Sequence, residues 1–109
     1  MSGEITTLVH HVYFWLKNPE SQGDFAQLLR GVNSLTTIDT IKGFHIATPA
    51  ATEDRDVIDN SYSLSWLAFF DSEADEQAYQ VHPTHLRFVE AYSHLWSRVV
   101  VYDSVQTPQ

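Results

Sequence analysis

The order of patterns along the chain predicts an α+β domain with a ferredoxin-like β-α-β-β-α-β arrangement, in which helices lie on one face of a four-stranded antiparallel sheet. Three observations predict it. The chain opens with an aromatic and β-branched stretch, helical and strand periodicities follow in that order, and Pro and Gly residues separate them. At 109 residues the chain is long enough for one hydrophobic core and too short for two, so we expect a single domain over residues 1–109.

The first half of the chain contains two strand patterns around one helical pattern. Residues 5–17 are rich in β-branched and aromatic side chains without Gly or Pro, which is typical of a long strand. Apolar residues then recur at helical spacing from Ser21 to Leu35, which predicts an amphipathic helix. Residues 41–48 alternate loosely around Gly43, which predicts a second strand with a bulge.

The second half continues with a loop, a strand, two helical segments and a last strand. Charged residues over 50–60 show little periodicity and predict an exposed loop, whereas residues 61–70 alternate and predict the third strand. Acidic residues after Asp71 predict a short helix that ends just before Pro83, which is itself well suited to begin another helix. Residues 98–105 then supply the fourth strand.

Composition excludes several classes of function. The chain has 14 acidic and 6 basic residues, and its net charge of -8 repels nucleic acids and anionic membranes. It contains no Cys, which removes disulfides, thiolate nucleophiles and Cys-ligated metals. No stretch is apolar over the length of a bilayer, and residues 1–4 lack a basic leader, so we expect a cytoplasmic protein.

The opening strand carries apolar side chains on both faces. If the helices cover one face, Val9, Tyr13 and Trp15 lie on the other. Leu67 and Phe69 of the third strand join them, and no part of the chain remains to cover this patch. Leaving such side chains in water forgoes about 1.5–3 kcal/mol each. Packing against the same face of a second copy removes the patch, so we expect a homodimer with two-fold symmetry.

The six histidines raise the question of a metal site. His10 and His11 are neighbours on a strand and therefore point to opposite faces. His82 and His85 are three residues apart, but no third ligand converges with them by pattern, whereas zinc needs three or four protein ligands. We therefore expect no metal site and no other cofactor.

Tyr79 and His85 are the candidate catalytic residues. Tyr79 precedes the turn that leads into the last helix, and His85 lies in the first turn of that helix on its apolar face. Burial and the positive end of the helix dipole disfavour an imidazolium, so we expect a neutral His85 that can accept a proton. A nearby Tyr hydroxyl can donate a hydrogen bond to a developing enolate or oxyanion. A second interpretation remains open, in which His85 is a core histidine that only fixes the turn.

A pocket between the helices and the sheet is the expected ligand site. His10 shares a strand face with Val12 and Phe14, so it either lines this pocket or serves as a buried polar plug. Aromatic side chains around it suit a small apolar or aromatic ligand. The full expected lining is His10, Phe14, Phe25, Tyr62, Leu64, Trp66, Phe88, Tyr92 and Trp96, of which the last three share one face of the last helix with His85.

Three segments carry the motifs of a known family. They are VHHVYFWLK over residues 9–17, AYQVHPTH over 78–85, and the stretch 95–103 with its Leu-Trp pair and final Asp. In the second segment a Tyr precedes a His-Pro-x-His element by three residues. Together they resemble the stress-responsive A/B barrel (Dabb) family over nearly the whole chain. This resemblance implies a dimeric α+β barrel in which two ferredoxin-like sheets face each other.

The resemblance also implies functions, which vary within the family. Some members are linked to stress tolerance, whereas a plant polyketide cyclase of the family performs an aldol condensation without a cofactor. Its catalytic Tyr and His match Tyr79 and His85 here, and the His of its first strand matches His10. A His of its third strand corresponds to Leu64, so the polar lining is reproduced only in part.

Three functions follow as hypotheses. The first is a cofactor-independent enzyme that performs cyclase- or isomerase-like proton transfer on a small apolar carbonyl compound. The second is a non-catalytic dimeric stress-response module whose interior is filled by its own side chains. The third is a cofactor-free monooxygenase, since antibiotic-biosynthesis monooxygenases share this architecture, although no motif favours it. An open cavity beside His85 and Tyr79 separates the first hypothesis from the second.

Overall fold

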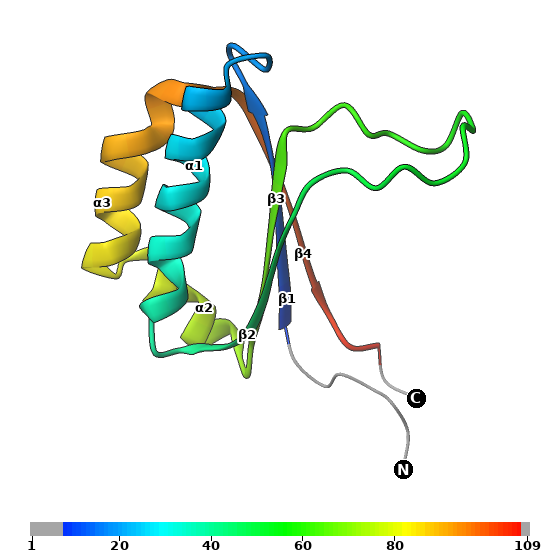
Figure 1. Ribbon diagram of the computed structural model, residues 1–109. Helices are drawn as coiled ribbons and strands as arrows, with labels where there is room; N and C mark the ends of the chain where they lie inside the picture. Colours follow the sequence, from blue (N-terminus) through cyan, green and yellow to red (C-terminus); the bar gives the residue numbers. More distant parts are fainter. Residues whose placement is uncertain (1–7, 108–109) are drawn as a thin grey trace.

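The chain folds into two layers, a four-stranded antiparallel sheet and a set of helices on one of its faces (Figure 1). The computed structural model describes residues 8–107. The elements in chain order are β1 (Leu8–Leu16), α1 (Gln22–Ser34), β2 (Ile41–Ala47), β3 (Leu64–Phe70), α2 (Glu73–Gln80), α3 (Pro83–Tyr92) and β4 (Trp96–Val105). Short 3-10 turns, Leu35–Thr37 and Ser93–Leu95, follow α1 and α3. The ferredoxin-like α+β prediction is confirmed.

The strand order in the sheet is β2-β3-β1-β4, so β1 and β3 are the central strands. In the antiparallel ladders, His10 lies opposite Ala68 of β3 on one side and Asp103 of β4 on the other. The register between β2 and β3 shifts between Ile41 and Gly43, which confirms the predicted bulge. β1 therefore lies in the middle of the sheet, and the side chains on one of its faces lie beneath the helices.

Capping side chains define where the helices begin. Ser21 Oγ accepts the backbone N–H of Asp24 at 3.2 Å, and Ser72 Oγ accepts that of Asp75 at 3.1 Å. α3 begins differently: His82 Nδ1 accepts the backbone N–H of Thr84 at 3.0 Å, and Pro83 occupies the first helical position. One histidine of the His-Pro-x-His element is thus used as a helix cap.

Some predicted boundaries differ from the structure. β3 begins at Leu64 instead of Ser61, and α3 ends at Tyr92, so Trp96 is the first residue of β4 and not part of the last helix. The 3-10 turn Ser93–Leu95 makes the reversal, and the Leu95 carbonyl accepts the backbone N–H of Lys17 at 2.9 Å. Residues 5–7 of the predicted first strand lie outside the described residues.

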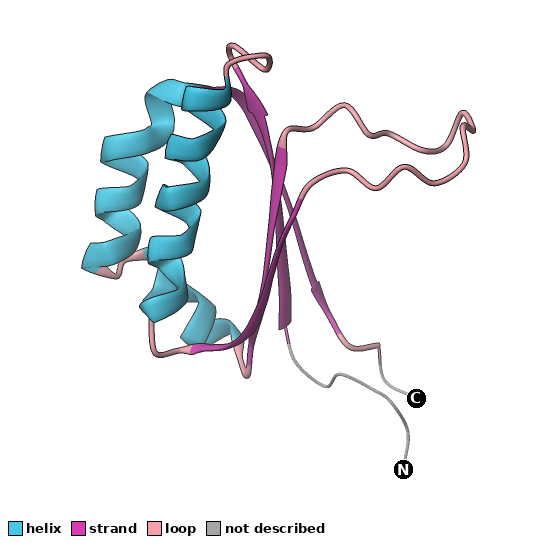
Figure 2. Ribbon diagram, viewed as in Figure 1, coloured by secondary structure: helices cyan, strands magenta, loops and turns pink. Residues whose placement is uncertain are grey.

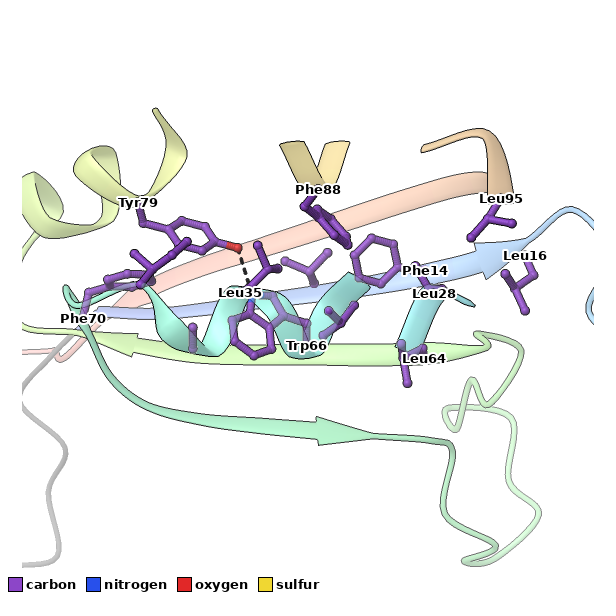
Figure 3. Close-up of a cluster of buried hydrophobic side chains, with 14 of the residues drawn as sticks. Phe14, Leu16, Leu28, Leu35, Leu64, Trp66, Phe70, Tyr79, Phe88 and Leu95 are labelled. Atoms are coloured by element: carbon purple, nitrogen blue, oxygen red, sulfur yellow. Dashed lines mark hydrogen bonds between the residues drawn. The ribbon is translucent and has the colours of Figure 1, made fainter. Parts of the chain in front are cut away.

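The hydrophobic core lies between the helices and the facing side of the sheet (Figure 3). Every second residue of β1 is buried there, from Leu8 to Leu16. α1 packs closely on α3, because a Cβ on the buried Gly31 would lie 2.7 Å from the ring of Tyr92. The helices thereby enclose the central part of the sheet.

All helices of the described chain lie on one side of the sheet, and the loop between β2 and β3 projects from the opposite face (Figure 2). Aromatic rings gather on this face: Tyr13 lies 4.8 Å from Tyr62 and 6.2 Å from Tyr102, measured between ring centroids. The guanidinium of Arg98 lies 4.5 Å above the ring of Trp15. Within residues 8–107, no helix has the length and apolar character needed to cross a membrane.

Candidate active site

A cavity of about 240 Å³ lies between the sheet and the α2–α3 helices. Its base consists of buried side chains: His10, Val12, Phe14, Leu35, Trp66, Tyr79 and Phe88. Gln80, His85 and Trp96 are half-buried at its wall, and Val89, Val99 and Val101 are exposed at its mouth. The lining is mostly apolar, with a few polar groups from α2, α3 and β1.

The cavity brings together most of the site residues expected from the sequence. Tyr79 and His85 lie in it with His10, Phe14, Trp66, Phe88 and Trp96. Leu35, Gln80, Val99 and Val101 also line it and were not anticipated. The β4 valines could have been found only with the sheet register, which places Val99 opposite Phe14 and Val101 opposite Val12.

Four of the expected lining residues lie elsewhere. Tyr62 packs against Tyr13 on the helix-free face, because β3 begins only at Leu64 and the strand alternation does not extend back to it. Phe25 and Leu64 line a separate hollow where α1 covers β2 and β3. Tyr92 stacks on Phe88 at 5.8 Å but faces α1, in a third hollow.

His85 is held with one ring nitrogen available. Its Nδ1 lies 3.0 Å from the backbone carbonyl of Gln80. A carbonyl oxygen only accepts, so Nδ1 carries the proton and Nε2 of the neutral ring has a lone pair. Within residues 8–107, no group hydrogen-bonds to Nε2. Burial lowers the pKa of His85 below its ordinary value, although the Gln80 carbonyl opposes the shift, so the ring is neutral at pH 7.

Tyr79 supplies a hydrogen-bond donor beside this base. Its ring lies 4.7 Å from that of His85, measured between centroids. The Nε1–H of Trp66 donates to the Tyr79 hydroxyl oxygen at 3.0 Å (Figure 3). Burial raises the pKa of Tyr79 well above its ordinary value, so the phenol keeps its proton. With its oxygen already accepting from Trp66, the hydroxyl can donate that proton in a hydrogen bond to a ligand.

His10 is buried next to two carboxylates. Its Nδ1 lies 2.6 Å from Asp103 Oδ1 and 3.8 Å from Glu76 Oε2, and its ring meets that of Tyr79 edge-on at 5.6 Å. These three residues have ligand atoms within 4.8 Å of one another. The 2.6 Å contact between His10 Nδ1 and Asp103 Oδ1 is a hydrogen-bond distance, so we interpret the three residues as a hydrogen-bonded group.

Sequence comparison decides the family. Residues 8–106 match the profile of the Stress responsive A/B Barrel Domain, Dabb. The chain belongs to the Dabb family. No curated protein matches the sequence.

Several solved structures share the fold of this Dabb domain. A Dabb family protein from Mesorhizobium loti is 20% identical, with a TM-score of 0.76 over 94% of this chain and 98% of that one. A hydroxynitrile lyase from Passiflora edulis is 22% identical, with a TM-score of 0.75 over 94% and 95%. A dimeric ferredoxin-like protein of unknown function from Thermobifida fusca is 18% identical, with a TM-score of 0.73 over 92% and 91%. At these identities the similarity concerns the fold.

Within this Dabb domain, the His-Pro-x-His element has two separate roles. His82 caps α3, and His85 lines the cavity one turn further along. Because His82 fixes where α3 begins, it also fixes the position of His85 in the first turn of that helix. The end of α2, just before His82, supplies the Gln80 carbonyl that bonds to His85.

Proposed function

We propose that this Dabb domain forms a homodimer and catalyses cofactor-independent proton transfer on a small apolar carbonyl compound. His85 acts as the general base, and Tyr79 donates a hydrogen bond to the carbonyl oxygen. One observation carries the proposal: an apolar cavity holds an imidazole nitrogen that has no partner among the described residues, beside a phenol that keeps its proton.

In the proposed step, Nε2 of His85 removes a proton from the carbon next to the carbonyl group. The C–H electron pair forms the new C=C bond, and the carbonyl π electrons move to the oxygen. The resulting enolate oxygen accepts the hydrogen bond of Tyr79. After its proton exchanges with solvent, the imidazolium returns a proton to the same carbon, which gives exchange, or to another position, which gives isomerisation. Alternatively, the enolate carbon bonds to a second carbonyl carbon of the same molecule and closes a ring, the π electrons of that carbonyl move to its oxygen, and the imidazolium protonates the resulting alkoxide.

The surroundings favour this chemistry. Water is largely excluded from the base of the cavity, where Tyr79 and Trp66 are each 1% exposed, so a hydrogen bond to a developing oxyanion is stronger there than in water. The Passiflora edulis hydroxynitrile lyase gives a precedent for an enzyme on this fold. The open cavity also argues against an interior filled by its own side chains, as the non-catalytic module requires.

Exchange of α-protons with solvent tests the proposed activity without a known substrate. Small ketones are incubated in D₂O with the protein, and NMR follows the loss of their α-proton signals. We expect exchange above the buffer rate, its loss in His85→Gln, and a reduction of about 10²–10³-fold in Tyr79→Phe. His94→Gln, at an exposed position in the 3-10 turn, is the matched control. Buffer rates with the wild-type protein for every ketone would leave the non-catalytic module as the better account.

The homodimer is supported by the helix-free face of the sheet. Tyr13, Trp15, Leu67 and Phe69 remain only partly buried there, and the related Thermobifida fusca protein is dimeric. Sedimentation should give about twice the chain mass of 12.5 kDa. Phe69→Glu should produce a monomer, whereas Leu86→Glu on the helix layer, 55% exposed, should remain dimeric. A monomeric wild-type protein at micromolar concentration would refute the dimer.

A further inference from the structure

The cavity is open on one side, and its mouth is apolar. Three of its lining residues, Val89, Val99 and Val101, are 40%, 42% and 46% exposed. Buried or half-buried side chains form the rest of the lining. We name these three residues the valine rim. They come from α3 and from the edge strand β4, so the mouth lies between that helix and that edge of the sheet.

Val99 and Val101 are exposed on the edge strand β4, and Val89 is exposed on α3. Val99 and Val101 pair with Phe14 and Val12, which places them on the helix side of the sheet and not on the face proposed for the dimer. A second copy packed on the helix-free face would therefore leave the rim uncovered. The exposed valines adjoin the apolar cavity directly. An apolar ligand that covers both the valines and the cavity wall therefore removes the most apolar surface from water and binds with the most favourable free energy.

We propose that the valine rim binds the apolar chain of the substrate, and that the substrate class is an uncharged carbonyl compound with an alkyl or arylalkyl chain. The carbonyl group lies at His85 and Tyr79, and the chain leaves the cavity along Val99 and Val101. The position of the carbonyl rests on the proposed function; the binding of the chain rests on the rim. One continuous cavity wall joins the two sets of residues.

Charge argues for an uncharged ligand. Of the residues described around the cavity, none is Lys or Arg, so no cation is present to pair with a carboxylate or phosphate. Asp103 follows Val101 on the same face of β4, and Glu76 lies close to Asp103 beside His10. The net charge of the chain, -8, adds to the repulsion of anions.

Size argues for a chain that reaches the rim. The cavity volume of about 240 Å³ is about the volume that eight water molecules occupy in liquid water. We expect a short ketone to occupy the part of the cavity lined by Tyr79, His85 and Phe88. A longer one must pass over the valine rim, so contacts with Val99 and Val101 increase with chain length.

A homologous series of methyl ketones, from 2-butanone to 2-undecanone, tests the proposal through dissociation constants measured by NMR titration. In the wild-type protein we expect the affinity to rise about fourfold per methylene throughout the series. In Val99→Thr/Val101→Thr, which keeps β-branched strand residues, we expect less than a twofold rise per methylene for the longer ketones and unchanged binding of 2-butanone. Val57→Thr, at a valine 79% exposed in the β2–β3 loop, should behave as wild type.

Two results would overturn the proposal: an affinity that stops rising at the same chain length in the wild type and in the threonine variant, or a rise that the variant retains in full. Decanoate gives a further arm. It should bind at least tenfold more weakly than 2-undecanone, and equal or tighter binding would refute the uncharged class.

The same samples separate this proposal from the proposed function. If affinity depends on chain length but His85→Gln does not change the rate of α-proton exchange, the valine rim is retained and the catalytic proposal is rejected. Exchange that depends on His85 without chain-length dependence would reject the rim and retain the catalyst.

Discussion

Trp66 and Tyr79 form a buried hydrogen bond that joins the sheet to α2 at the base of the cavity, with Nε1–H donating to the Tyr79 hydroxyl at 3.0 Å. Tyr79→Phe removes the acceptor and leaves the indole N–H buried without a partner. We expect the free energy of unfolding to fall by about 1–3 kcal/mol, measured by urea denaturation. Trp66→Phe should cost more, because it also removes indole volume from the core.

A double-mutant cycle checks that the hydrogen bond itself causes these losses. Trp66→Phe/Tyr79→Phe removes both polar partners, so its cost should be smaller than the sum of the single costs. Single costs that add to within about 0.5 kcal/mol would show that the two residues do not depend on each other.

Two glycines of α1 should respond to alanine with opposite signs. At Gly31 the added Cβ would lie 2.7 Å from the ring of Tyr92, so Gly31→Ala should destabilise the protein by about 1–3 kcal/mol despite the better helix propensity of Ala. Gly23, in the first turn, is the matched control, because its nearest contact would be Ser21 Oγ at 4.0 Å. Gly23→Ala should stabilise by up to about 1 kcal/mol. Thermal unfolding of both variants tests this, and a stabilising Gly31→Ala would show that the helices are less closely packed than described.

Asp103 should stabilise the protein by giving the buried His10 a hydrogen-bond partner. His10 is 4% exposed, and its Nδ1 is bonded to Asp103 Oδ1 at 2.6 Å. Asp103→Ala leaves the imidazole without this partner, and we expect a loss of about 1–3 kcal/mol in urea denaturation. Asp103→Asn keeps an acceptor oxygen and should cost less. Equal losses of unfolding free energy in the two variants would show that the acceptor oxygen at position 103 does not stabilise the protein.

The dimer should weaken in acid because of His11 on the helix-free face. Burial lowers the pKa of His11, and the nearby His45 and His10 lower it further. These effects act within a single chain. A second copy packed on this face would bury His11 further and lower its pKa again, so protons would bind the separate chains more tightly and the dimer would weaken as the pH falls. Between pH 7.5 and pH 5 we expect the dissociation constant of the dimer to rise on the order of tenfold.

Sedimentation of His11→Gln provides the comparison for that effect. The variant cannot gain a proton at this position, so its dimer should depend less on pH than that of the wild type. An identical pH dependence in both proteins would exclude His11 as its source.

The sequence predicts most of this fold because local patterns agree with it. The alternation in β1, the capping serines and Pro83 each act over a few residues, and the structure has the expected element at each. Tyr79 and His85 could be placed in one cavity for a similar reason, since a short turn joins their helices. Trp96 could not, because helical spacing continues past Tyr92 in the sequence while a 3-10 turn ends the helix in the structure.

Residues that meet through sheet register could not be placed from the sequence. Asp103 was expected on β4, but its bond to His10 depends on how β4 aligns with β1. The same holds for Val99 and Val101 at the cavity mouth. Tyr62 shows the opposite error, because extending the alternation of β3 two residues too far placed its ring on the wrong face.

The pH dependence of α-proton exchange tests the central claim most directly. If neutral His85 is the base, the rate should fall as acid protonates it, with an inflection below its ordinary pKa of about 6.5, because burial lowers the pKa of His85. The measurement compares exchange rates of one ketone from pH 4.5 to 8 in wild type and His85→Gln. We expect that inflection in the wild type and background exchange in the variant. An inflection above 6.5, or the same profile in both proteins, would contradict it.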